Sequence, residues 1–132
     1  MAAAPAYAPT PVLWCGLIPG TADTSWTAPT HVTALGTAGT AGTKIVQIDV
    51  IPAGGTVVAG LVNVFAYDGT TYHLHESVTI AAGTISTTAA PVKQTYSYDN
   101  LVLPSSSWAL TVTGTVSSNA GLVEVNAFGA SL

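Results

Sequence analysis

With 132 residues the chain has room for one domain, and its 48% of hydrophobic residues suffices for a core. Only eight residues are charged, six acidic and two basic, whereas twenty are threonine and ten are serine. We expect neither nucleic acid nor a membrane as partner, because both need clustered basic residues and only Lys44 and Lys93 are present. A freely diffusing protein keeps about a quarter of its residues charged, so this scarcity predicts a component of an assembly.

The first residues differ in composition from the rest. Residues 1–11 are rich in Ala and Pro, and they lack the basic region and the continuous apolar run of a signal peptide. We expect them to form an extended N-terminal arm, residues 12–132 to form a single domain, and the protein to be made in the cytoplasm.

The segment that follows holds the one cysteine of the chain. A strand is predicted near residues 12–18, where the apolar neighbours of Cys15 favour a buried, unreactive thiol. Residues 19–43 are loop-like, with a possible strand at 30–34. The segment from Gly36 to Gly42 is either flexible or ordered by a neighbouring subunit.

Apolar alternation and turn signals then continue to the C-terminus. Asp68-Gly69 is a strong hairpin signal, Gly60 predicts a bend, and Trp108, Leu110 and Val112 are expected to face the core. The strands are expected at residues 43–51, 56–67, 71–80, 94–103, 107–113 and 121–128. About seven or eight strands predict an all-β fold, an antiparallel β-sandwich that is jelly-roll-like.

His73-Leu74-His75-Glu76 is the motif closest to a metal site. Residues i and i+2 of a strand share a face, so His73 and His75 are candidate metal ligands, as in the His-x-His that begins the metal site of cupins. Glu76 would point to the opposite face, and only His31 remains as a third nitrogen ligand. The pattern favours imidazoles on a surface, so we expect no metal and no cofactor.

The sequence contains few of the residue patterns that are typical of enzyme active sites. Ser105-Ser106-Ser107 lacks the Gly-x-Ser-x-Gly context of a nucleophile, and no phosphate loop or dinucleotide fingerprint is present. Paired-carboxylate hydrolysis would need two acids at a suitable separation. Its candidates are Asp49, Asp68, Glu76 and Asp99, of which Asp68 is already explained by its turn. We therefore expect no enzymatic activity.

The aromatic residues leave a second functional class open, that of a sugar-binding module. A sugar-stacking platform is conceivable from Trp14, Trp26, Tyr96, Tyr98 and Trp108. Trp108 is expected in the core, however, and Trp26 lies in a loop, where one exposed tryptophan more often marks a subunit contact. A carbohydrate-binding β-sandwich module of a tail or fibre is the alternative.

Several segments in the last two thirds of the chain carry a family likeness through their order and spacing. They are residues 42–48, 60–69 and 72–76, then 101–104 leading into 108–110, and 125–129. Together they resemble small virion surface proteins of tailed bacteriophages, over residues 40–130. The ending Gly129-Ala130-Ser131-Leu132 departs from the acidic residue after paired glycines expected in such proteins.

The resemblance implies a structural virion protein. Its expected role is that of a capsid decoration (cement) protein, which binds the outer surface of the phage head and stabilises it. The implied partners are the major capsid protein and further copies of the chain, with a trimer favoured. The residues expected at capsid or subunit contacts are Pro5, Tyr7, Pro9, Trp14, Trp26 and His31.

Overall fold

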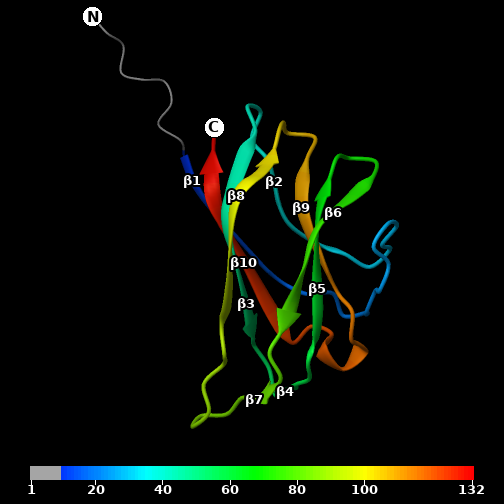
Figure 1. Cartoon of the computed structure of the whole chain (residues 1–132), viewed down its shortest axis with the longest axis vertical. Coiled ribbons are helices and arrows are strands. Elements are labelled where there is room, and N and C mark those ends of the chain that lie inside the picture. Colours follow the sequence, from blue (N-terminus) through cyan, green and yellow to red (C-terminus); the bar gives the residue numbers. More distant parts are fainter. Residues whose placement is uncertain (1–9) are drawn as a thin grey trace, which may run out of the picture.

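The computed structural model describes residues 10–132, and these form an all-β structure (Figure 1). The described chain has ten strands rather than seven or eight, because β4 and β7 form an additional two-residue pair at one end. The strands are β1 (Thr10–Leu17), β2 (Thr33–Thr37), β3 (Thr43–Pro52), β4 (Thr56–Val57), β5 (Gly60–Tyr67), β6 (Tyr72–Ile80), β7 (Gly83–Thr84), β8 (Gln94–Leu103), β9 (Ala109–Gly114) and β10 (Val123–Ser131).

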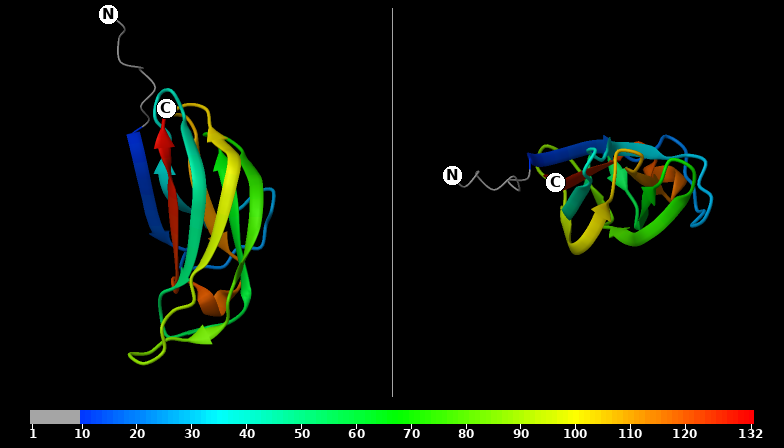
Figure 2. Two further views of the ribbon diagram at one scale, coloured as in Figure 1. Left: turned by 60° about the vertical axis from the view of Figure 1, so that its left-hand side comes forward. Right: turned by 90° about the horizontal axis from the view of Figure 1, so that it is seen from above.

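The eight longer strands form two antiparallel sheets that pack face to face (Figure 2). Sheet A has the order β1-β10-β3-β8 and sheet B the order β2-β9-β5-β6. Between them lies a core of Val, Ile and Leu, including Ile48 and Val125 of sheet A and Val64 and Val112 of sheet B, all fully buried. Burying this apolar surface is the main stabilising contribution to the fold.

Hydrogen bonds also join the two sheets along both long sides. On one side, the Thr33 hydroxyl of β2 donates to the Leu17 carbonyl at the end of β1, 2.8 Å away. On the other side, the Thr79 backbone N–H of β6 donates to the Tyr96 hydroxyl of β8 at 3.2 Å. The edge strands of the two sheets therefore contact each other across the sandwich.

The β5–β6 hairpin forms where the Asp68-Gly69 signal predicted it. Gly69 has φ +97°, a left-handed conformation that glycine adopts without steric cost. Asp68 Oδ1 accepts hydrogen bonds from the backbone N–H groups of Thr70 (2.8 Å) and Thr71 (2.6 Å). This local capping explains why the turn could be located from two residues.

Three boundaries differ from those expected. β1 begins at Thr10, so the last two residues assigned to the arm belong to the sheet, while residues 1–9 lie outside the described part. β2 occupies part of the predicted 19–43 loop. The strand expected over residues 56–67 is divided into β4 and β5, and the second part begins at Gly60.

The prediction of a buried thiol is wrong, because Cys15 is exposed. Side chains alternate along β1, and Trp14 points inward to pack against the core. Its neighbour Cys15 must then point outward. The larger apolar side chain of the pair takes the inner position.

Candidate interaction surfaces

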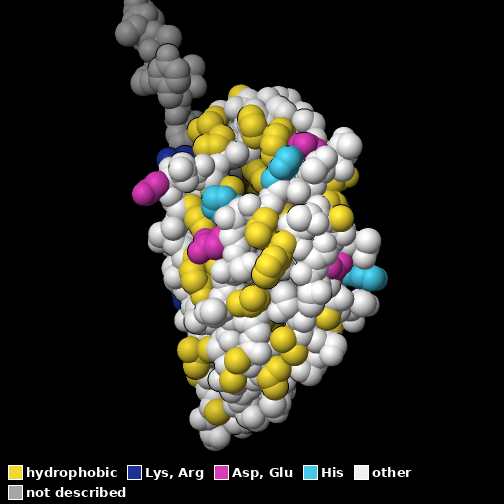
Figure 3. Space-filling model, turned by 45° about the vertical axis from the view of Figure 1, so that its right-hand side comes forward, with side chains coloured by type: hydrophobic (Ala, Val, Ile, Leu, Met, Phe, Trp, Pro, Cys, Tyr) yellow, Lys and Arg dark blue, Asp and Glu magenta, His cyan; other side chains and the backbone are white. Residues whose placement is uncertain are grey.

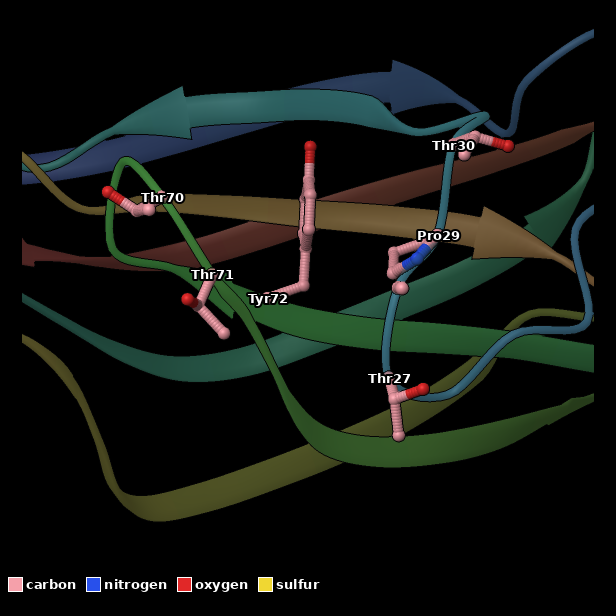
Figure 4. Close-up of a pocket in the computed structure, with 7 residues that line it drawn as sticks. Thr27, Pro29, Thr30, Thr70, Thr71 and Tyr72 are labelled. Carbon is pink, nitrogen blue, oxygen red and sulfur yellow. The ribbon is translucent and has the colours of Figure 1, made fainter.

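The outer face of sheet B is covered by the protein's own chain. Phe65 and Thr111 alternate with core residues and so lie on the outer face, yet both are almost fully buried. The segment of residues 19–32 runs along this face (Figures 1 and 4), and its Pro29 is buried. The Asp23 backbone N–H donates to the Gly114 carbonyl of β9 at 2.8 Å, which ties the segment to the sheet.

Asp23 also organises this segment internally. Its Oδ1 accepts from the Ser25 backbone N–H at 2.9 Å, and its Oδ2 accepts from those of Thr30 (2.7 Å) and His31 (3.0 Å). The hydrogen bond from Ser25 and then that from Thr30 lower the pKa of Asp23 below its ordinary value, because they favour the ionised carboxylate. One side chain thus holds eight residues of loop in shape.

The outer face of sheet A is open in contrast. Its outward residues include Leu13, Cys15 and Leu17 of β1, Glu124, Asn126 and Phe128 of β10, Lys44, Val46, Gln47, Asp49 and Ile51 of β3, and Thr95, Ser97 and Val102 of β8. We call this set the open face. No segment within residues 10–132 crosses it (Figure 2), and Leu13 and Leu17 are 57% and 44% exposed.

The one carboxylate at the centre of the open face is compensated. Asp49 is buried, accepts from the Thr95 hydroxyl (2.8 Å) and from Gln47 Nε2 (3.0 Å), and lies 3.6 Å from Lys93 Nζ. Hydrogen bonds and an ion pair of this kind offset the cost of burying a carboxylate. The side chains around it in the middle of the open face, Gln47, Thr95 and Asn126, bear amides and a hydroxyl and carry no charge.

The residues predicted at contacts lie in different places. Trp26 is 56% exposed on the 19–32 segment, and the exposed His31 has its Nδ1 3.8 Å from Asp23 Oδ2. Trp14 is half-buried, and its indole packs so closely on Gly36 that a methyl group there would overlap it. Pro5, Tyr7 and Pro9 lie outside the described residues.

The two histidines of β6 have separate surroundings. His73 Nε2 lies 3.0 Å from Asp68 Oδ2 and its ring stacks on Trp108 at 5.7 Å, whereas His75 meets Tyr98 edge-on at 4.9 Å. A β-bulge leaves His75 without a partner on β5. Histidine side chains accordingly form separate patches on the surface (Figure 3). Within residues 10–132 no three His, Cys, Asp or Glu side chains come together in a group that could hold a metal ion.

The candidate catalytic groups are also dispersed. The Ser105 and Ser107 hydroxyls lie 3.0 Å from each other in the turn before β9. Burial and then the nearby Glu76 raise the pKa of Tyr98, so this phenol stays protonated. The Thr30 hydroxyl lies 3.2 Å from His31 Nδ1 in the 19–32 segment, whereas His73 is paired with Asp68 and the serine hydroxyls of residues 105 and 107 with each other.

A hollow of about 370 Å³ lies between the 19–32 segment and the β5–β6 turn. It is lined by residues 27–30 and 70–72, with the Tyr72 ring standing between Thr71 and Pro29 (Figure 4). Sequence reasoning missed this hollow. Its only signal was the repeated threonine in two segments about forty residues apart, which the fold brings together.

No protein-family model, curated protein or solved structure matches the chain. In the described residues there is no helix long and apolar enough to cross a membrane.

Proposed function

We propose that this chain is a structural virion protein with a jelly-roll fold. Counted in chain order, the eight longer strands have the orders 1-8-3-6 in sheet A and 2-7-4-5 in sheet B. That order is typical of the jelly roll, a double sheet built from two Greek keys, which recurs in viral capsid and lectin domains. A fold alone does not define a function, so the argument depends on the surface.

The open face is the observation that carries the proposed role. Sheet B covers its own outer face with the 19–32 segment, whereas sheet A leaves the exposed Leu13 and Leu17 of β1 without such a cover, and the partly buried Phe128 of β10 lies opposite Leu13. Contiguous exposed apolar side chains rimmed by polar groups are typical of protein interaction sites. We infer that the open face lies against the major capsid protein, as a decoration protein on the outside of a phage head.

The composition and the family likeness support this inference. A decoration protein needs a rigid framework and a contact surface but no catalytic group, and three of the acidic residues, Asp23, Asp49 and Asp68, are engaged within the chain. The resemblance of residues 40–130 to virion surface proteins agrees with this role. Several copies around a local symmetry axis, most simply a trimer, would bind adjacent capsid subunits together and gain avidity.

Substitutions on the open face test the proposal. In a binding assay with phage heads that lack the protein, Leu13→Glu combined with Leu17→Glu is expected to abolish attachment, because two charges would be buried against an apolar surface. The matched control is Val58→Glu combined with Leu74→Glu, since these side chains are 40% and 42% exposed and lie outside the open face. Full occupancy by the double variant, with its fold intact by circular dichroism, would refute attachment through this face.

A further inference from the structure

The hollow between the 19–32 segment and the β5–β6 turn has the dimensions of a small binding site. Its volume of about 370 Å³ is at the lower end of the range for ligand pockets, which suits a single ring rather than a larger molecule. Its lining residues, 27–30 and 70–72, include four threonines, one tyrosine, one proline and one alanine, and none is charged.

Most of the lining hydroxyls make no hydrogen bond within the described chain. Within residues 10–132, the side-chain hydroxyls of Thr27, Thr70, Thr71 and Tyr72 make no hydrogen bond, whereas that of Thr30 lies 3.2 Å from His31 Nδ1 and 3.4 Å from Asp23 Oδ2. Each threonine hydroxyl can donate one hydrogen bond and accept others. The pKa of Tyr72 is raised, first by burial and then by Tyr67, so its hydroxyl also remains a donor.

Two carboxylates hold the walls of the hollow in place without lining it. Asp23 accepts hydrogen bonds from the backbone of the loop wall at Thr30, and Asp68 accepts them from the turn wall at Thr70 and Thr71. Tyr72 is fixed by stacking on Tyr67, with ring centroids 4.2 Å apart. The walls are therefore preorganised, which lowers the entropic cost of binding.

We propose that this hollow binds one pyranose ring of a neutral sugar. A ring with several hydroxyls matches four free hydroxyls that both donate and accept, and its C–H face can lie against the Tyr72 ring or Pro29. A charged sugar would find no compensating charge among the lining residues. The inference is independent of the proposed capsid attachment, because the hollow and the open face belong to opposite sheets.

Titration of ¹⁵N-labelled protein with D-glucose, D-galactose, N-acetylglucosamine and N-acetylneuraminic acid tests this proposal. At least one neutral sugar is expected to bind with a dissociation constant of about 1 mM and to shift the amide signals of Thr27 and residues 70–72. Thr71→Val keeps the shape of the side chain but removes its hydroxyl, and is expected to weaken binding about fivefold. Thr40 is an exposed threonine in the loop before β3. The Thr40→Val variant is therefore the matched control, and it should bind the sugar as the unaltered protein does.

Four results would overturn the proposal. The first is no shift with any neutral sugar up to about 50 mM, well above the affinity expected of so small a ligand. The second is a set of shifts that avoids Thr27 and residues 70–72. The third is unchanged binding by both Thr71→Val and Thr70→Val. Preference for N-acetylneuraminic acid over every neutral sugar would likewise contradict an uncharged site.

Discussion

Asp23 Oδ2 accepts a hydrogen bond from the Thr30 backbone N–H at 2.7 Å, and this contact closes the 19–32 segment over the outer face of sheet B. The two outer faces of the sandwich differ because of this segment. The 19–32 segment covers Phe65 and Thr111 on the outer face of sheet B, and no segment within residues 10–132 covers the open face.

Asp23→Ala is expected to lower the free energy of unfolding by about 2 kcal/mol, since hydrogen bonds to a charged acceptor contribute more than neutral ones. Urea denaturation measures this loss. Thr24→Ala is the control, because Thr24 is exposed and adjacent but outside the Asp23 network. Equal stability of the two variants would mean that Asp23 does not hold the segment.

Acid should destabilise the protein through the β5–β6 turn. The backbone hydrogen bond from Thr71 and then the side-chain hydrogen bond with His73 lower the pKa of Asp68 from 3.8 to about 2. A carboxyl with a lowered folded-state pKa stabilises the fold above its ordinary pKa, and this contribution is lost as pH falls from about 4 toward 2. Asp68→Asn should therefore flatten the stability profile between these pH values in urea titrations, whereas a profile as steep as that of the unaltered protein would contradict this assignment.

The contact between Trp14 and Gly36 predicts that one methyl group added at position 36 lowers the stability of the fold. Gly36→Ala would overlap the indole ring and is expected to cost about 2 kcal/mol, the usual penalty for overpacking. Gly83→Ala is the matched control, since a Cβ there meets no atom within 4 Å. Thermal denaturation of both variants measures the difference, and equal melting temperatures would show that Trp14 can move away.

Attachment to the phage head should depend little on salt. Leu13 and Leu17 are the exposed apolar side chains of β1 on the open face, and its central Asp49 is already paired with Lys93. Salt screens contacts between exposed charges but does not weaken apolar burial. Co-sedimentation with heads at about 0.05 and 0.5 M NaCl should give similar occupancy, a range over which screening removes most surface charge interactions. Release at the higher concentration would indicate a contact made by charges.

Local patterns predicted much of the fold. The β5–β6 hairpin depends on Asp68-Gly69 alone, and the buried Leu110 and Val112 follow from strict alternation in one strand. The prediction for Cys15 was wrong because it depended on which of two neighbouring apolar side chains faces the core. Cys15 is exposed because Trp14 takes the inner position.

The interaction surfaces depend on contacts between distant residues, which alternation does not encode. Asp23 bonds residues two to eight positions ahead of it, and the hollow joins Thr27 to Thr71. The bulge at His75 likewise arises from the pairing of β5 with β6 and has no signal in the His73-Leu74-His75 motif. Composition could indicate that a surface is covered in an assembly, but only the sheet order shows which face is available.

An electron cryomicroscopy reconstruction of the phage particle is the most direct test of the proposed virion role. The account predicts density for this chain on the outer surface of the head, with Leu13 and Leu17 of sheet A turned toward the capsid and the 19–32 segment turned toward solvent. A particle without this density, or one in which the 19–32 segment faces the shell and sheet A faces solvent, would contradict it.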